Sequence, residues 1–139
     1  MRFVDSSIFV HAILKPSRRL ERHEAEIKER AKGMLRRIED GEAAATTVVH
    51  VSEVANILEA RTTREESRRI LSALASMRSL RLIRVTGDAY RAAVQASSVL
   101  GVGVNDAMAY IAMAERGINE AYSFDRHFDQ LPEITRITS

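Results

Sequence analysis

The stretch VDSSIF, residues 4–9, interrupts an apolar run with one carboxylate, Asp5, and two hydroxyl groups. The apolar residues before it predict a short buried strand over residues 2–4, and those after it predict a helix over 5–14 that Pro16 ends. The acid at this junction can cap the helix, because a carboxylate accepts hydrogen bonds from the free N–H groups of the first turn. It can also bind a ligand, so its role depends on which other residues the fold brings near it.

Short strands and helices alternate along the rest of the chain. Further strands are predicted at residues 43–48, 80–85, 121–124 and 134–138. Helices are predicted at residues 17–40, 49–60, 64–77, 87–100 and 105–115, with Thr63 and Thr86 as N-caps. Such alternation is typical of a parallel sheet with helices on both faces. We therefore expect one α/β domain over residues 1–139, in which the apolar helix at 105–115 is buried.

The composition is that of a globular protein, with 45% hydrophobic and 29% charged residues. Cysteine is absent, so any metal must be held by oxygen or imidazole groups. There is no signal-peptide pattern and no apolar run of about 18 residues, which predicts no membrane span and a cytoplasmic location. Most of the 21 basic residues are arginines, whose planar group suits phosphate, and the net charge is +2. The composition therefore permits a nucleic-acid partner without demonstrating one.

Asp5 is one of four acids placed near the points where strands give way to helices. Glu53 lies early in the helix after the second strand, Asp106 begins the buried helix, and Asp125 follows the fourth strand. In an open parallel sheet the ligand crevice lies beyond the carboxyl ends of the strands, so the acids can meet at one rim. Asp5, Asp106 and Asp125 also suit N-caps. Periodicity alone places Glu53 on a solvated helix face.

If these carboxylates converge, they predict a metal site. Acids crowded in one cleft repel one another and raise one another's pKa values unless a cation lies among them. Oxygen-only ligation points to Mg²⁺ or Mn²⁺, and such a site activates water for attack on a phosphodiester. His11, His50 and His127 lie near the acids but lack close ligand spacing, so they are interpreted as surface or core histidines.

Four segments resemble the PIN-domain nucleases and, among them, the VapC-type toxins of toxin–antitoxin pairs. They are VDSSIF (4–9), SEVANIL with Glu53 (52–58), NDAMAYIAMAERG with Asp106 (105–117) and AYSFDRHFDQLPEI with Asp125 (121–134). The segments occur in the family's order and spacing over almost the whole chain. The resemblance implies a three-layer α/β/α sandwich around a parallel sheet of about five strands. It also implies a Mg²⁺- or Mn²⁺-dependent endoribonuclease.

The resemblance assigns roles to individual residues. It implies that the acidic metal site consists of Asp5, Glu53, Asp106 and Asp125. Ser7 matches a small hydroxyl or amide position that supports a carboxylate or a bound water, and Ser123 stands where the family usually has Thr. Asp129 is a second acid near the fourth position, so the fourth acid of the site is either Asp125 or Asp129. Asn105 either contacts the metal shell or caps a helix.

Partners follow from the same resemblance, which implies an RNA substrate, a cognate antitoxin and a homodimer. Arg126, Arg64 and Arg68 are candidate phosphate contacts, although the last two also suit a solvated helix face. Two alternatives stay open: a PIN-fold nuclease of RNA processing outside a toxin–antitoxin pair, and a PIN-fold module that binds RNA or protein without cleaving. A haloacid-dehalogenase-like phosphatase fits less well, because Ser7 stands where that chemistry needs a second Asp.

Overall fold

All of the predicted strands are present in the computed structural model, which describes residues 1–139. They are β1 (Arg2–Val4), β2 (Ala44–Thr47), β3 (Leu80–Ile83), β4 (Glu120–Tyr122) and β5 (Thr135–Ile137). Neighbouring strands are parallel throughout, in the order β3-β2-β1-β4-β5. The prediction of a five-stranded parallel sheet is confirmed.

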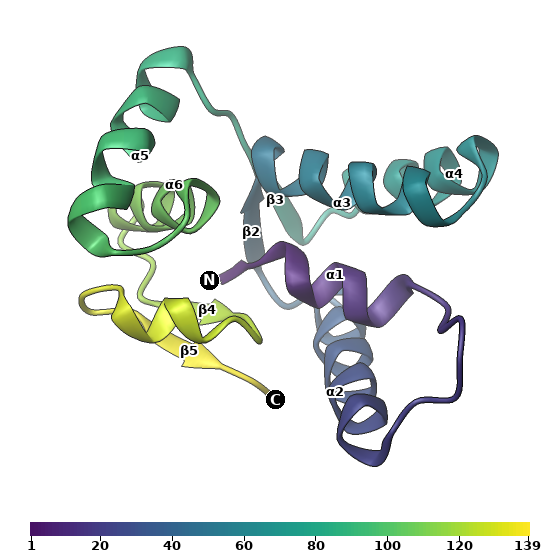
Figure 1. Cartoon of the computed structure of the whole chain (residues 1–139). Helices are drawn as coiled ribbons and strands as arrows, with labels where there is room; N and C mark the ends of the chain where they lie inside the picture. Colours follow the sequence, from purple (N-terminus) through teal and green to yellow (C-terminus); the bar gives the residue numbers. More distant parts are fainter.

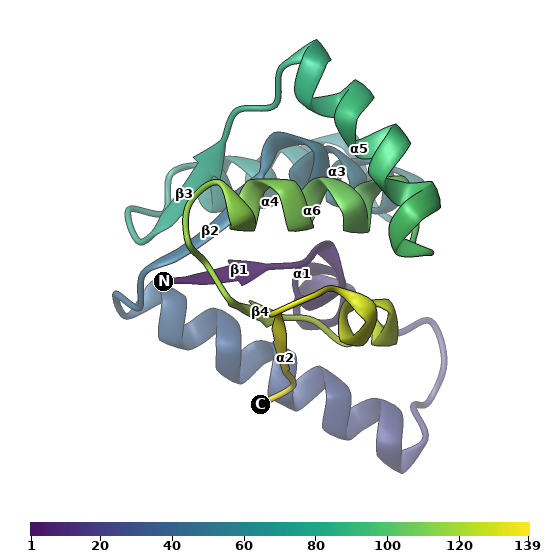
Figure 2. The ribbon, with the colours of Figure 1, turned by 90° about the vertical axis from the view of Figure 1, so that its left-hand side faces the viewer.

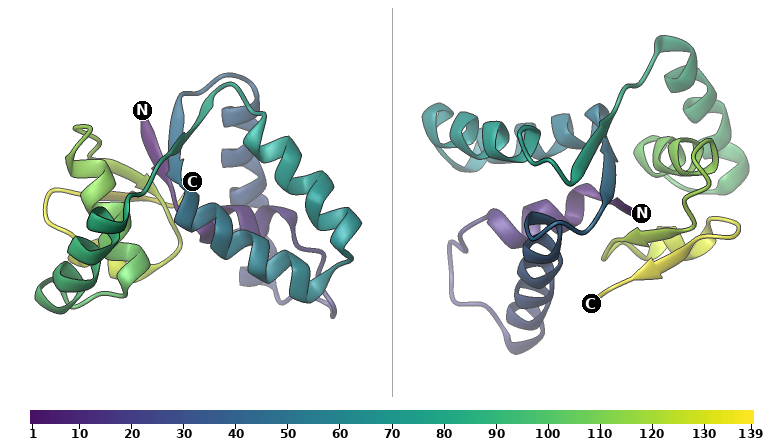
Figure 3. Two further views of the ribbon diagram at one scale, coloured as in Figure 1. Left: turned by 90° about the horizontal axis from the view of Figure 1, so that it is seen from above. Right: turned by 180° about the vertical axis from the view of Figure 1, so that it is seen from behind.

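Helices cover both faces of this sheet (Figure 1, Figure 2). On one side lie α1 (Ser6–Ile13), α2 (Arg22–Glu39), α3 (Val48–Arg61) and α4 (Arg64–Ala75). On the other side lie α5 (Gly87–Leu100), α6 (Val104–Ala114) and the 3₁₀-helix η1 (Arg126–Gln130). Two further views show the same two groups (Figure 3). The predicted three-layer α/β/α arrangement is confirmed, and none of the helices combines the length and apolar character that a membrane crossing requires.

The core divides into two apolar clusters because successive strand residues point to opposite faces of the sheet. In β1, Phe3 packs with α5, α6 and η1, whereas Val4 packs with α1 to α4. The same alternation separates Ala121 from Tyr122 in β4. Helix α6 packs between the sheet and α5, and most of its apolar side chains are buried, as predicted from its sequence.

The helix boundaries agree with the prediction except at two places. Helix α2 starts at Arg22 instead of residue 17. A capping box between Glu21 and Glu24 marks this start, and Arg18 holds the Glu24 carboxylate at 2.8 Å. The 3₁₀-helix η1 was not predicted, because so short a segment leaves no periodic pattern in the sequence.

The strand order creates a crevice beside β1. From β1 the chain builds β2 and β3 on one side, and then returns to place β4 and β5 on the other side. In open parallel sheets the ligand crevice lies beyond the carboxyl ends of the strands at such a reversal. Asp5 follows β1 directly and Ser123 follows β4 directly, so both residues lie at this point.

Candidate functional site

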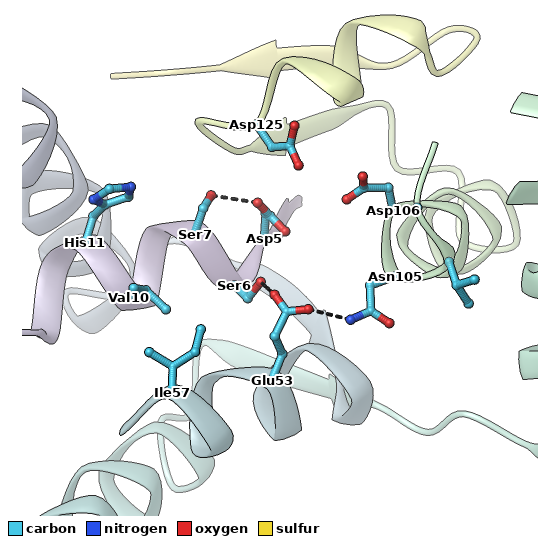
Figure 4. A pocket seen from close by; sticks show the side chains of 12 residues that line it. Asp5, Ser6, Ser7, Val10, His11, Glu53, Ile57, Asn105, Asp106 and Asp125 are labelled. Carbon is cyan, nitrogen blue, oxygen red and sulfur yellow. Dashed lines mark hydrogen bonds between the residues drawn. The ribbon is translucent and has the colours of Figure 1, made fainter. Parts of the chain in front are cut away.

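A cleft of about 610 Å³ opens at the carboxyl ends of β1 and β4. It is lined by all four predicted acids, Asp5, Glu53, Asp106 and Asp125 (Figure 4). They come from separate segments, namely the end of β1, helix α3, helix α6 and the start of η1. In Figure 4 the side chains of Asp5, Asp106 and Asp125 point toward one another, so the fold brings the acids together as the sequence predicted.

Asp5 is buried, with 5% of its surface exposed, and its orientation is set by two serines. Its Oδ2 atom accepts hydrogen bonds from Ser7 Oγ at 2.6 Å and from Ser123 Oγ at 2.8 Å. The serines are held in turn, because the N–H of Phe124 donates to Ser7 Oγ and that of Asp125 donates to Ser123 Oγ. Asp5 occupies the N-cap position of α1, but its side chain makes no capping bond, so the cap interpretation is wrong here.

Glu53 points from α3 toward the same cleft. Its Oε1 atom accepts a hydrogen bond from Ser6 Oγ, and its Oε2 atom accepts one from Asn105 Nδ2. The placement of Glu53 on a solvated face is therefore wrong, because α1 and α6 approach that face of α3. Asn105 is not a helix cap, because Gly103 holds the N-cap position of α6.

Asp106 lies in the first turn of α6 and is the least stabilised of the acids. Its burial, followed by the negative charges of Asp125 and Asp5, raises the pKa of Asp106 to about 6. Gly103 precedes the helix as its N-cap, so Asp106 does not cap it, and no protein group donates a hydrogen bond to its carboxylate. A carboxylate in this position is stabilised by a bound cation.

Asp125 lies at the cleft, whereas Asp129 does not. The Oδ1 atom of Asp125 accepts hydrogen bonds from the backbone N–H of His127 at 2.9 Å and from the ring Nδ1 of His127 at 2.7 Å. Asp125 is thus an N-cap, one of the two roles that its place in the sequence suits, although the helix η1 that it caps was not predicted, and it also lines the cleft. Asp129 forms a two-pronged ion pair with Arg136 at 2.8 and 2.9 Å, which lowers the pKa of Asp129. Its charge is therefore neutralised outside the cleft.

The three histidines near the acids lie in different environments. His50 is fully buried, with Nδ1 at 2.7 Å from Thr47 Oγ1, and burial lowers its pKa. The interpretation as a core histidine is confirmed for His50. His11 is exposed and lines the cleft, where partial burial lowers its pKa, and His127 is exposed beside Asp125.

The arginines proposed for RNA contact lie apart from one another. Arg126 is exposed and adjoins Asp125 at the start of η1. Arg64 and Arg68 are exposed on α4, which extends away from the sheet, and neither lines the cleft (Figure 1). None of the three arginines lines the cleft, one of them adjoins Asp125 in sequence, and the other two are on a separate helix.

The donor groups of the cleft suit a hard divalent cation. Asp106, Asp125 and His127 each offer one ligand atom, and these atoms lie within 4.8 Å of one another. No lysine or arginine forms an ion pair with Asp5, Glu53 or Asp106, and the raised pKa of Asp106 agrees with this lack of a cationic partner. Carboxylate oxygens are the ligands that Mg²⁺ and Mn²⁺ prefer, so the residues present fit such a cation.

Two contributors to the cleft were not found from the sequence. Ser6 donates to Glu53, and His127 donates to Asp125. The only signal in the sequence is proximity, because Ser6 adjoins Asp5 and His127 follows Asp125 by two residues. Proximity of this kind does not reveal which partner a side chain reaches.

Comparison with known proteins places these observations in a family context. The family model described as PIN domain matches residues 2–134. No curated protein matches the chain.

Several solved structures share the fold. VapC20 of Mycobacterium tuberculosis has a TM-score of 0.69 and 20% sequence identity, over 90% of each chain. VapBC2 of Rickettsia felis has a TM-score of 0.67 and 15% identity, over 98% of this chain and 96% of that one. A toxin–antitoxin complex from Klebsiella pneumoniae has a TM-score of 0.65 and 15% identity, over 97% and 96% of the two chains. At these identities the likeness establishes the fold, which extends over nearly the whole chain.

Proposed function

Because the chain belongs to the PIN-domain family, we propose that it is a Mg²⁺- or Mn²⁺-dependent endoribonuclease that hydrolyses RNA phosphodiester bonds. The observation that carries this proposal is the convergence of Asp5, Glu53, Asp106 and Asp125 on one cleft. The raised pKa of Asp106, which follows from burial and from the neighbouring negative charges, supports it. A cluster of acids without internal cationic partners favours a cation from solution.

The four acids would hold the cation. When bound, the cation would offset their negative charge, lower the pKa of a water molecule and stabilise the charge that develops on the phosphate. The chain's own hydroxyl and amide groups orient the acids before any ligand arrives. Ser7 and Ser123 both donate to Oδ2 of Asp5, so Oδ1 of Asp5 is the oxygen left without a protein donor.

Glu53 and Asn105 complete the wall of the cleft opposite Asp125 (Figure 4). The Asn105 amide donates to Oε2 of Glu53, and Ser6 donates to Oε1, so rotation of the Glu53 carboxylate breaks both bonds. Fixed carboxylates favour catalysis because little reorganisation is needed when the substrate binds. Arg126 is the arginine closest in sequence to the acids and is our candidate for phosphate contact, while Arg64 and Arg68 stay predictions for RNA bound across α4.

We further propose that the protein is the toxin of a VapBC-type toxin–antitoxin pair. VapC20 of M. tuberculosis is described as a toxin that cleaves the sarcin–ricin loop, and the K. pneumoniae structure is described as a toxin–antitoxin complex. The present chain covers about the same length as these proteins. A cognate antitoxin, a homodimer and a cytoplasmic location stay predictions of this proposal.

The test is RNA cleavage by the purified protein with and without divalent cation. Cleavage is expected with Mg²⁺ or Mn²⁺ and is expected to stop in EDTA. Asp5→Asn and Asp106→Asn are each expected to slow cleavage at least about 100-fold, because a bound metal stabilises the transition state by several kcal/mol. Asp88→Asn is the matched control, because Asp88 is an exposed acid on α5 that pairs with Arg91.

Cleavage that persists in EDTA, or that Asp106→Asn leaves undiminished, would contradict the metal-dependent mechanism. Cation binding without cleavage of any RNA, including ribosomal RNA and transfer RNA, would favour the non-catalytic PIN module. The antitoxin is sought as the product of a gene next to this one. If its co-expression does not inhibit cleavage, an RNA-processing nuclease is favoured.

A further inference from the structure

The carboxylate of Asp125 is oriented by two hydrogen bonds from its neighbour His127. A single oxygen of Asp125, Oδ1, accepts both the backbone N–H of His127 at 2.9 Å and the ring Nδ1 of His127 at 2.7 Å. The remaining oxygen, Oδ2, has no protein donor. Both donors come from one residue, so the orientation of the Asp125 carboxylate depends on where η1 holds His127.

The 3₁₀-helix that carries His127 is anchored by the two residues that follow this histidine. Phe128, the next residue, is fully buried in the core cluster that covers this face of the sheet. Asp129 is tied to Arg136 of β5 by two hydrogen bonds of 2.8 and 2.9 Å. The backbone of His127 therefore cannot shift without disturbing the core or this ion pair, which keeps the imidazole beside Asp125.

Two other acids of the cleft also accept two hydrogen bonds each. Asp5 receives two donors from Ser7 and Ser123, and Glu53 receives two donors from Ser6 and Asn105. In each case the donors are side chains from outside the set of acids. At Asp125 both donors come instead from one residue, His127, which supplies one from its backbone and one from its side chain.

We infer that His127 is a positioning residue, which donates Nδ1–H to Oδ1 of Asp125 and so presents Oδ2 to the divalent cation. This inference rests on the proposed function, since it assumes that the cleft binds such a cation. In this role the imidazole supplies a proton to a hydrogen bond and does not itself ligate the metal. A ligating Nδ1 would instead offer its lone pair, and the hydrogen bond to Asp125 would be lost.

The test is the dissociation constant of Mn²⁺ and of Mg²⁺, measured by titration calorimetry on the full chain without RNA. His127→Ala is expected to weaken the binding of both ions by about tenfold, the effect typical of losing a group that orients a metal ligand. His127→Asn is expected to restore binding to within about threefold of the wild type, because the Asn amide nitrogen can replace Nδ1 as the donor.

Two controls isolate the hydrogen bond. His127→Gln carries the same amide one methylene further out and is not expected to restore binding. His23→Ala removes another exposed histidine, on α2, and is expected to leave binding unchanged. Pulsed electron paramagnetic resonance of the Mn²⁺ complex is expected to show no coupling to an imidazole nitrogen.

The outcomes separate this inference from the proposed function. If the wild-type protein binds neither ion, the proposed function fails. If the wild type binds but His127→Ala binds equally well, only the positioning role is overturned. Imidazole nitrogen coupling, or a loss of Ni²⁺ affinity much larger than the loss of Mg²⁺ affinity, would overturn it in favour of direct ligation, since imidazole prefers the softer ion.

Discussion

Acidic side chains gather at both ends of the parallel sheet, but the acids at the amino ends of the strands have strong cationic partners. Arg2 begins β1 and lies 3.0 Å from Glu42 and 3.0 Å from Glu120. The hydroxyl of Tyr122 donates to Glu42 at 2.7 Å, and the guanidinium of Arg37 lies 5.5 Å from the centre of the Tyr122 ring. At the carboxyl ends, Asp5, Glu53 and Asp106 have no ion pair with lysine or arginine, and the only ion pair of Asp125 is with His127.

The pKa values of the acids at the two ends are shifted in opposite directions. Burial alone would raise the pKa of Glu42, but hydrogen bonds from Tyr122 and Arg2 and the charges of the two arginines outweigh burial and lower it. Burial raises the pKa of Asp106 to about 6, and the neighbouring carboxylates add to the effect. Carboxylates at the amino ends of the strands are thus neutralised by the chain's own arginines, whereas Asp106 at the carboxyl ends is not.

The largest effect we predict is that a cation bound at the carboxyl ends of the strands stabilises the folded protein. Mn²⁺ at about 100 times its dissociation constant should stabilise the wild type by about 2.7 kcal/mol, which raises the Tm by about 5 to 10 °C. Asp106→Asn should lose most of this shift, whereas Glu120→Gln at the opposite end should keep it. Thermal unfolding followed by circular dichroism measures the three shifts, and equal shifts in all three proteins would place the cation outside the cleft.

The sequence predicted the sheet and three of the acids from local pattern. The alternation of short apolar strands with helices predicted the layers, and Asp5, Asp106 and Asp125 were singled out because of their places beside strand ends or at a helix start. Glu53 was different, because its place after the second strand put it among the acids that could meet at the rim, whereas its periodicity predicted solvent exposure. Its burial depends on α1 and α6, which approach α3 from distant parts of the chain.

Most of the hydrogen bonds that orient the acids were beyond prediction for the same reason, although the resemblance implied that Ser7 supports a carboxylate. Ser123 reaches Asp5 across 118 residues of sequence, and Asn105 reaches Glu53 across 52. His127 is near Asp125 in sequence, but its role depends on the conformation of η1, which leaves no periodic signal. Local pattern thus predicts which elements form, while the partners of polar side chains depend on how those elements pack.

Arg2→Ala tests the opposite end of the comparison and should have an intermediate effect. The variant leaves Glu42 and Glu120 without their shared partner in a half-buried position, so the free energy of unfolding should fall by about 1 to 2 kcal/mol, between the values typical of exposed and buried pairs. Arg18→Ala breaks an exposed pair with Glu24 and should lower the free energy of unfolding much less. Urea denaturation measures both, and a drop in Mn²⁺ affinity in the folded Arg2 variant would contradict the separation of the two ends.

A further prediction concerns the pH dependence of stability without metal, which should have opposite signs at Asp106 and Asp129. Between pH 4 and 6 the folded protein holds a proton on Asp106 that the unfolded chain has released, so this group lowers stability as the pH rises through that window. Asp106→Asn cannot titrate, and in EDTA it should match the wild type near pH 4 and become the more stable protein by pH 7. The pKa of Asp129 is lowered by Arg136, so Asp129 contributes stability that is present above its unfolded pKa and lost in acid.

Asp129→Asn should therefore be less stable than the wild type at pH 7 and should approach it as the pH falls below 4. Melting curves of the three proteins at pH 3.5, 5, 6 and 7 in EDTA measure both trends. A stability difference between Asp106→Asn and the wild type that stays constant across this range would mean that folding does not raise the pKa of Asp106. It would remove the electrostatic reason for a cation at this end of the sheet. The two variants are predicted to change stability at pH 7 in opposite directions. This difference depends on the charge environment of each acid, because both substitutions exchange the same carboxylate for the same amide.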